Sequence, residues 1–459
     1  MKKPIEVKEY QAIVCKSKEK LKPKYNIPNN VKPIEDAVFK QLQLFIEKFG
    51  KSKDISDVHE FISIEHNKDF AYTITLKNYV GLIQLKDGTQ LNVLPKIDFV
   101  DDKNNFGDDE NAGNEKTKRT FLYMLQSMKN FPGKSFNVGS LNVARMSLLD
   151  IFIRMYLQEV WKLVKQGIRS SYVSEEDNLR YFKGKLLFAQ HLRYNLAHQE
   201  RFYVIFEDFN INRPENKLIK AMLLKLQRLT SDTVNSQFIK QLLAVFDSVD
   251  ASTNFVKDFQ KVVNNRDTMV YTDLISWTKI FLFNQTFTPF AGSNSATSFL
   301  FPMEQVFEDY VAKIVRKIFT PNEGWDVSCQ EKKLSLSTEP TKMFWIKPDI
   351  VLKYHENSQD QTIIMDTKWK RLKADIEKNY GIEQDDIYQM YAYAKRYQSK
   401  HIWLLYPKTK EMYDNKKFKF KLFDETVIQL FFVDVAKEKI MENLGQLKKE
   451  VYEALRLKC

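Results

Sequence analysis

The spacing of apolar positions predicts a first part that mixes strands and helices. The segment PIEDAVFKQLQLFIEKFG (residues 33–50) has apolar residues at helical spacing and ends on a glycine, which is typical of a helix. The segment YVGLIQLKDGTQLNVLPKI (79–97) predicts two strands joined at Asp87-Gly88, a dipeptide that favours a hairpin. The polar, acidic stretch DFVDDKNNFGDDENAGNEKTK (98–118) predicts a mobile loop.

From about residue 120 the pattern becomes mostly helical. The segment LLDIFIRMYLQEVWKLVKQG (148–167) is apolar on most faces and predicts a buried helix that stops at Gly167. A second helix is expected to begin with Asn212 as its N-cap and Pro214 in its first turn. The segment TPFAGSNSATS (288–298) is rich in small polar residues, and it predicts a domain boundary.

The remaining sequence alternates regularly between segments with the apolar spacing of a helix and segments with the apolar spacing of a strand. An amphipathic helix (302–319) precedes three strands, a helix (382–397), the strands HIWLLYP and VIQLFFVDV, and a terminal helix. We therefore expect an α+β, β-rich N-terminal region (1–119) and a mostly helical middle region (120–290). An α/β domain (299–459) with a central mixed sheet flanked by helices is expected to follow.

Composition adds a charge argument. The 71 Lys and Arg residues outnumber the 59 Asp and Glu residues and leave a net charge of +12 in a chain of 459 residues. A basic excess favours association with a polyanion such as nucleic acid, although a soluble basic protein without that partner fits the charge equally well.

Cysteine usage and hydropathy restrict the cellular setting. Cys15, Cys329 and Cys459 are far apart and odd in number, so they indicate neither a disulfide framework nor a four-cysteine metal site. No signal peptide or apolar run of about 20 residues is present, so we expect a cytoplasmic protein without a membrane segment. Among the histidines only His191 and His198 are close in sequence, as a weak metal-ligand pair or as ordinary surface or core residues.

The segment KPDIVLKYHENSQDQTIIMDTKWK (347–370) carries the candidate chemistry. Asp349 begins one apolar run, Asp366 and Lys368 end the next, and residues i and i+2 of a strand share a face. A hairpin would bring the two carboxylates and the lysine together, a grouping that suits metal-assisted phosphodiester hydrolysis with Mg²⁺ or Mn²⁺. A structural Asp-Lys pair at a strand end is the alternative, because D-x-K is a common tripeptide.

The order of these motifs resembles the PD-(D/E)-x-K nuclease superfamily. PD (348–349) and DTK (366–368) precede a helix that contains QMYAY, in which Gln389 and Tyr393 share one face. They match the Q-x-x-x-Y element of the RecB-like branch, and the resemblance implies that they lie beside the metal site. Ordinary helix packing and a surface amide are the alternative.

The resemblance also implies a carboxylate on the helix that precedes the three strands. Glu308, in VFEDYV, occupies the position where many of these nucleases carry an acid near the metal. Glu304 or Asp309 could take this place instead. Alternatively, all three acids could simply lie on a solvated helix face. The resemblance therefore implies Asp349, Asp366 and Glu308 as metal ligands.

Further segments are similar to the McrC family, the nuclease subunits of McrBC-type modification-dependent restriction systems. They are YVGLIQLKDGTQLNVLPKID, GIRSSYVSEEDNLRYFKGKLLFAQHLRYN, PENKLIKAMLLKL, FLFPMEQVFEDYV and DDIYQMYAYA, in that order. The similarity extends from about Tyr79 to Pro407. One departure is Lys183-Gly184-Lys185, where the family pattern would begin with arginine-glycine.

The McrC resemblance implies a division of labour. The chain would dock on an McrB-like AAA+ GTPase through its N-terminal half, with residues 1–119 as a docking region, and would stimulate that GTPase. Its C-terminal domain would cleave double-stranded DNA near modified cytosine. GTP would be bound only by the partner, since the chain has no G-x-x-x-x-G-K-[ST] motif. The basic runs KWKRLK (368–373) and KTKEMYDNKKFKFK (408–421) could contact phosphates or could be solvated loops. A stand-alone RecB-like repair nuclease and a non-enzymatic scaffold are the two rival classes.

Overall fold

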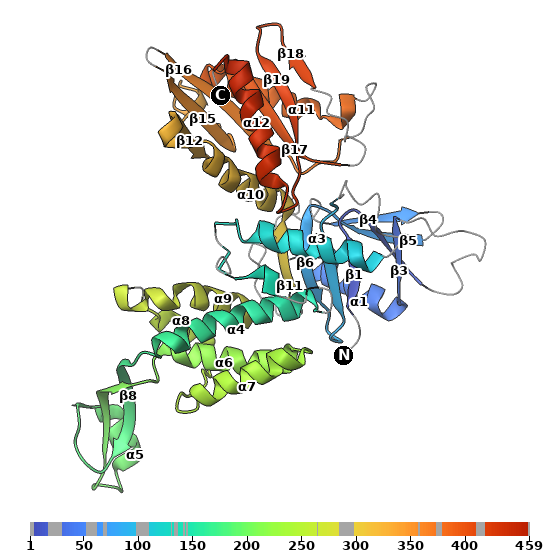
Figure 1. Ribbon diagram of the computed structural model, residues 1–459. Coiled ribbons are helices and arrows are strands. Elements are labelled where there is room, and N and C mark those ends of the chain that lie inside the picture. The colour runs from blue at the N-terminus through green and yellow to red at the C-terminus, as the bar shows by residue number, and fades with distance from the viewer. Residues whose placement is uncertain are drawn as a thin grey trace. The chain divides into compact units, whose positions relative to one another are not determined.

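A computed structural model gives the architecture of the chain (Figure 1). It describes residues 4–16, 30–51, 62–67, 71–97, 110–129, 131–132, 136–140, 143, 146–263, 265–283, 298–356, 359–372, 379–409 and 418–457. The chain divides into two compact units. One unit, the helical unit, is Met146–Gln285, and the other, the sheet unit, combines Lys2–Arg145 with Thr286–Cys459.

The helical unit is built on buried apolar helix faces. Its helices are α4 (Leu148–Gln166), α6 (Pro214–Leu229), α7 (Thr233–Val245), α8 (Phe255–Lys261) and α9 (Thr272–Leu282). A small sheet in the order β8-β10-β9 adjoins α5; the bounds are β8 Ser171–Leu179, β9 Lys185–Leu186, α5 Phe188–Asn195 and β10 Phe202–Asn210. The predicted helix at 148–167 is confirmed, and it ends where Gly167 adopts a positive φ of 87°.

Two four-stranded sheets form the N-terminal part of the sheet unit. The first has the order β1-β7-β6-β11, and the second has the order β3-β2-β5-β4. The strand bounds are β1 Ile5–Lys8, β2 Ala12–Cys15, β3 Val31–Ile34, β4 Ile62–Asn67, β5 Ala71–Leu76, β6 Tyr79–Gln84, β7 Gln90–Leu94 and β11 Ser298–Pro302. The predicted hairpin at 79–97 is present as β6 and β7.

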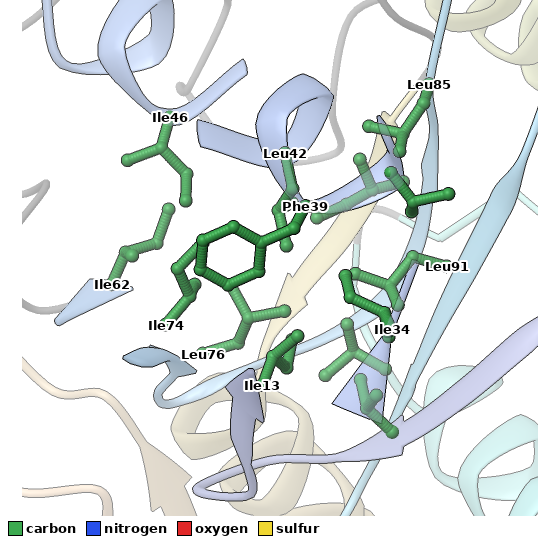
Figure 2. Close-up of a cluster of buried hydrophobic side chains, with 14 of the residues drawn as sticks. Ile13, Ile34, Phe39, Leu42, Ile46, Ile62, Ile74, Leu76, Leu85 and Leu91 are labelled. Atoms are coloured by element: carbon green, nitrogen blue, oxygen red, sulfur yellow. The ribbon is translucent and has the colours of Figure 1, made fainter. Parts of the chain in front are cut away.

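The helix α1 (Asp36–Lys51) packs its apolar face on these strands. Figure 2 shows Phe39, Leu42 and Ile46 of this helix facing Ile13 and Ile74. All five side chains are at most 5% exposed. Burial of this many large apolar groups is the main favourable term in the stability of the region.

A six-stranded mixed sheet forms the C-terminal part of the sheet unit, in the order β12-β15-β16-β17-β19-β18. The strands are β12 Trp325–Cys329, β15 Ile350–Glu356, β16 Gln359–Thr367, β17 His401–Pro407, β18 Lys419–Lys421 and β19 Val427–Val433. The helices are α10 Met303–Ile318, α11 Gln384–Tyr397 and α12 Ile440–Leu455, and β13 (Ser335–Ser337) pairs with β14 (Met343–Trp345). The sequence order α-β-β-β-α-β is therefore present, in a mixed α/β fold (Figure 1).

The apolar core of this sheet fixes the face on which α11 lies. Met390 and Tyr393 of α11 pack with Ile364, Ile402 and Leu404 from β16 and β17. Because alternate residues of a strand point to opposite faces, Asp366 lies on the same face as Ile364 and so on the side of α11.

The N-terminal region and the C-terminal domain belong to one compact unit. The physical reason is that β11 pairs with β6, with Leu300 opposite Gly81. The helix α3 (Glu110–Leu125) also contacts α10. The boundary segment 288–298 falls outside the described residues except for its last residue.

Two local expectations are wrong. Residues 110–118 form the first part of α3 rather than a loop, because Asn114 and Lys118 are buried against Glu6, to which the Asn114 amide donates at 2.9 Å. Residues 98–109 of that stretch lie outside the described residues. The N-cap of α6 is Arg213 rather than Asn212, because a proline at the first helical position puts the cap one residue before it.

Within the ranges given above, none of the helices combines the length and the apolar character needed to cross a membrane.

Gly81 permits the pairing of β6 with β11, and this predicts a large cost for replacing it. Its φ is +135°, and an added Cβ would lie 1.9 Å from the carbonyl oxygen of Phe299. We expect Gly81→Ala to lower the free energy of unfolding by about 2–3 kcal/mol through strain and clash. Gly88→Ala is the control, because Gly88 has φ +81° with open space around it, so only the backbone cost remains. The measurement is thermal denaturation of both variants. Equal losses of stability in Gly81→Ala and Gly88→Ala would contradict this explanation.

Candidate active site

The hairpin of β15 and β16 brings the two aspartates of the sequence motif together. The strands are antiparallel, with Ile350 opposite Met365. Asp349 therefore immediately precedes β15 beside the end of β16, where Asp366 lies. The hairpin expected from the sequence is present, and its carboxylates lie at the same edge of the sheet.

Thr367 holds the Asp349 carboxylate in place. Its backbone N–H and its hydroxyl both donate to Asp349 Oδ2, each at 2.7 Å. Burial raises the pKa of Asp349 even though these two hydrogen bonds lower it. The Asp366 side chain is almost fully buried, and burial followed by the charge of Asp349 raises its pKa to about 7. The two carboxylates thus share one site, and the negative charge of each makes ionisation of the other less favourable.

Lys368 is the cation of this site. Its Nζ lies 2.9 Å from Asp366 Oδ2 and donates to Gln389 Oε1 at 2.9 Å. Burial lowers the pKa of Lys368, but the charges of Asp366 and Asp386 raise it, and the net result is a pKa above the ordinary value. Lys368 is therefore an ammonium ion directed at the end of β16.

Gln389 and Tyr393 form one hydrogen-bonded line along α11. The Gln389 amide donates to the Tyr393 hydroxyl at 2.8 Å, and that hydroxyl donates to the carbonyl oxygen of Lys347 at 3.2 Å. The four-residue spacing places both side chains on one helix face, as the sequence indicated. Tyr393 thus fixes the Gln389 amide so that its oxygen accepts from Lys368.

Glu308 approaches the same site from α10. Gln330 donates to its Oε1 at 2.6 Å, and Gln305 donates to its Oε2 at 3.2 Å. Burial, followed by the charge of Asp349, raises the pKa of Glu308 to about 7. Of the two competing acids, Glu304 is exposed, and Asp309 accepts the backbone N–H of Lys129 at 3.3 Å.

Two side chains near the site were not predicted from the sequence. Asp386 lies 3.6 Å from Lys368 Nζ and accepts from Lys370 at 3.2 Å, and it is almost fully buried. Its position three residues before Gln389, on the same helix face, is a signal that could have found it. No sequence pattern indicates Gln330. It follows β12, has a left-handed backbone (φ 52°), and reaches Glu308 from there.

The donor set fits a hard divalent cation. The close carboxylates Asp349 and Asp366 raise each other's cost of ionisation, and a bound cation would relieve it. Across the described part of the chain, no three His, Cys, Asp or Glu side chains form a compact ligand group. The chain itself would therefore supply a pair of carboxylates. That suits Mg²⁺, which usually keeps several waters and takes one or two carboxylates with phosphate oxygens.

The other candidates from the sequence have ordinary surroundings. His191 Nδ1 lies 3.1 Å from the Asn195 amide nitrogen, and His198 Nδ1 lies 3.4 Å from Glu200. In the first basic run, Lys370 pairs with Glu383 at 2.8 Å and with Asp386. Most of the second basic run falls outside the described residues, as does Lys373.

The fold resembles that of a chain in a solved assembly of Thermococcus gammatolerans McrB and McrC. A chain of the refined half-complex of Thermococcus gammatolerans McrB AAA+ hexamers with bound McrC matches with a TM-score of 0.64 and 16% identity. The match covers 97% of this chain and 100% of that chain. A chain of the Thermococcus gammatolerans McrBC complex matches with a TM-score of 0.45 and 17% identity, over 69% and 89% of the two chains. At these identities the likeness concerns the fold alone.

A search among curated protein sequences found no match. The model of the family described as McrBC 5-methylcytosine restriction system component matches residues 74–407. This match spans well over half of the 459 residues, and it includes Glu308, Asp349, Asp366, Lys368, Gln389 and Tyr393. The chain therefore belongs to the McrBC 5-methylcytosine restriction system component family.

Proposed function

We propose that the chain is the nuclease subunit of a modification-dependent restriction system and hydrolyses phosphodiester bonds of double-stranded DNA. The observation that carries the proposal is the convergence of Asp349, Asp366 and Lys368 at one sheet edge, with Gln389 bound to the lysine. The strand-strand-helix arrangement that holds these side chains supports a PD-(D/E)-x-K nuclease core.

Asp349 and Asp366 would hold Mg²⁺, for which Mn²⁺ could substitute, while Glu308 lies near this pair without completing a compact group of three ligands among the described residues. When bound, such an ion supplies a Lewis acid for the phosphoryl group and lowers the pKa of a bound water. The chain's own contribution is to fix the carboxylates. Thr367 holds one oxygen of Asp349, and Gln330 and Gln305 hold both oxygens of Glu308.

Lys368 would stabilise the negative charge that develops on the attacked phosphate. A charged donor is most effective when it is positioned before the reaction and shielded from water. Gln389 and the carboxylates of Asp366 and Asp386 give Lys368 three fixed partners. Its side chain is 19% exposed, so it retains access to a substrate at the surface.

We propose in addition that the chain acts with an McrB-like AAA+ GTPase, which would bind GTP and read the modified cytosine. The helical unit offers a surface for such docking. Within residues 171–210, large apolar side chains are more than half exposed: Tyr172, Tyr181, Phe182, Phe188, Leu192, Tyr194, Leu196 and Phe209. The number of exposed apolar side chains in this one segment supports a partner-binding surface there.

Replacing either aspartate should abolish cleavage. We expect Asp349→Asn and Asp366→Asn to slow DNA cleavage by about 100-fold or more, because lost metal binding removes several kcal/mol of transition-state stabilisation. Stimulation of the partner's GTP hydrolysis should stay unchanged. The measurement is cleavage of a duplex containing modified cytosine, with the full chain, its partner, GTP and Mg²⁺.

Asp360→Asn is the matched control, because Asp360 lies on the same strand but is 63% exposed and pairs with His355. It should cut at the wild-type rate. Wild-type cleavage by Asp366→Asn would remove the assignment of the site. Cleavage by the wild-type chain with Mg²⁺ and no partner would instead favour the stand-alone nuclease.

Asp386 is a positioning residue for Lys368 in this account. Asp386→Asn should lower kcat by about 10-fold or more, the usual cost of losing a partner of an active-site group, and leave KM nearly unchanged. Asp386→Glu should restore part of the rate. Asp385→Asn removes the same charge from the same helical turn at an exposed position. Equal losses in Asp385→Asn and Asp386→Asn would show that the charge at the start of the helix matters, rather than the contact with Lys368.

The docking surface can be tested by making it polar. The double variant Phe188→Ser and Leu196→Ser should weaken binding to the GTPase and reduce its stimulation, since the two side chains are 70% and 78% exposed. Met269→Ser is the control, because Met269 is 71% exposed in the same unit but outside residues 171–210. Binding measured by calorimetry should distinguish the two. Undiminished affinity in the double variant would place docking elsewhere.

A further inference from the structure

A pocket adjoins the candidate active site, because Glu308 lines it and also interacts with Asp349. Its volume is about 140 Å³. The residues that line it are Ser127, Lys129, Glu308, Asp309, Ala312, Lys313, Arg316, Cys329 and Gln330. A water occupies about 30 Å³ of the liquid, so the pocket has room for a group of the size of a phosphate together with water.

Gln330 connects the pocket to the active site. Its side-chain oxygen accepts from Lys129 Nζ at 3.2 Å, and its amide nitrogen donates to Glu308 at 2.6 Å. Its backbone N–H donates to the carbonyl oxygen of Asp349 at 2.9 Å. One residue with a left-handed backbone therefore bridges the pocket, Glu308 and the first residue of the catalytic hairpin. Such a conformation costs about 1 kcal/mol or more and is often found at functional sites.

Three cations line the pocket against two acids. Lys313 and Arg316 are three residues apart on α10, so they share a face, and both are exposed. Asp309 accepts the Lys129 backbone N–H, and Glu308 accepts from Gln330, so both acids already have donors. The lining therefore carries more cations than acids, and Lys313 and Arg316 both reach solvent.

We propose that this pocket binds a backbone phosphate of the DNA strand, next to the phosphate that is cleaved. The proposal rests on the proposed nuclease function and adds a substrate subsite to it. Arginine binds phosphate oxygens with a rigid fork of donors, and lysine adds a point charge. The contact would position the DNA strand without reading its sequence. Because Gln330 contacts both Glu308 and Asp349, it would link the position of the strand to the positions of these two acids.

The charge contribution of Arg316 can be measured in DNA binding without cleavage. The full chain is titrated with a duplex in EDTA at several salt concentrations, as wild type, Arg316→Gln and Lys317→Gln. Loss of one phosphate contact should reduce the slope of log K against log[salt] by about 0.9. We expect this reduction for Arg316→Gln alone. Lys317 is the adjacent exposed cation on α10 and does not line the pocket.

Cys329 provides a second readout inside the pocket. Its thiol is half-buried, burial raises its pKa, and Arg316 contacts it. Bound duplex should slow alkylation of Cys329, while Cys15, whose thiol donates to Asp36 at 2.8 Å and does not line the pocket, serves as the internal control. Arg316→Gln should remove the protection of Cys329, and Lys317→Gln should retain it.

The results separate this subsite from the proposed function. A reduced slope and lost protection in Arg316→Gln alone support the phosphate site, whether or not the complex with the partner cuts DNA. Identical slopes for wild type and Arg316→Gln, equal changes in both variants, or no duplex binding at all would overturn it. In the cleavage assay, Arg316→Gln should raise KM more than it lowers kcat. Inorganic phosphate at constant ionic strength should not protect Cys329 as the duplex does; equal protection would indicate a site for the free anion instead.

Discussion

Asp349, which is half-buried, and Asp366, which is almost fully buried, lie side by side at one edge of the six-stranded sheet, and the repulsion between their charges is the main electrostatic constraint on the groups around them. Ionised carboxylates in a protein interior are costly unless they have donors or a cation. Thr367 supplies two donors to Asp349, and Lys368 supplies a cation to Asp366. These contacts leave both pKa values raised, so the protein alone compensates the charge only in part. A divalent cation would complete the compensation, which is why this edge is the proposed centre of the chemistry.

The supporting contacts reach beyond the hairpin. Trp369, the residue after Lys368, donates from its indole nitrogen to Glu9 at 2.7 Å, and the Lys96 backbone N–H donates to the same carboxylate oxygen at 2.9 Å. Glu9 is fully buried, and burial raises its pKa to about 7. The end of β16 is therefore bound to the N-terminal sheets. This explains why the N-terminal region and the C-terminal domain form one compact unit rather than two.

Periodicity predicted the elements that carry the site, because the strands and α11 are long enough to show a pattern of apolar positions. The pairing of Asp349 with Asp366 followed from a short turn between two such strands. The sequence could not show that β11 completes the sheet of β6, since the two segments are more than 200 residues apart. The helical start of α3 was hidden because its buried face is polar, with Asn114 and Lys118 directed at Glu6. Asp386 was missed because an acid in the first turn of a helix is ordinary in sequence, although its three-residue spacing from Gln389 placed it on the same helix face.

The central claim is that this edge of the sheet binds a divalent cation through its two aspartates. Calorimetric titration of Mn²⁺ into the full chain, wild type against Asp366→Asn, tests it most directly. The account predicts a binding site in the wild type that is lost or greatly weakened in Asp366→Asn, with the same thermal stability in both apo proteins or a higher one in the variant. Equal Mn²⁺ binding by the two proteins would contradict it.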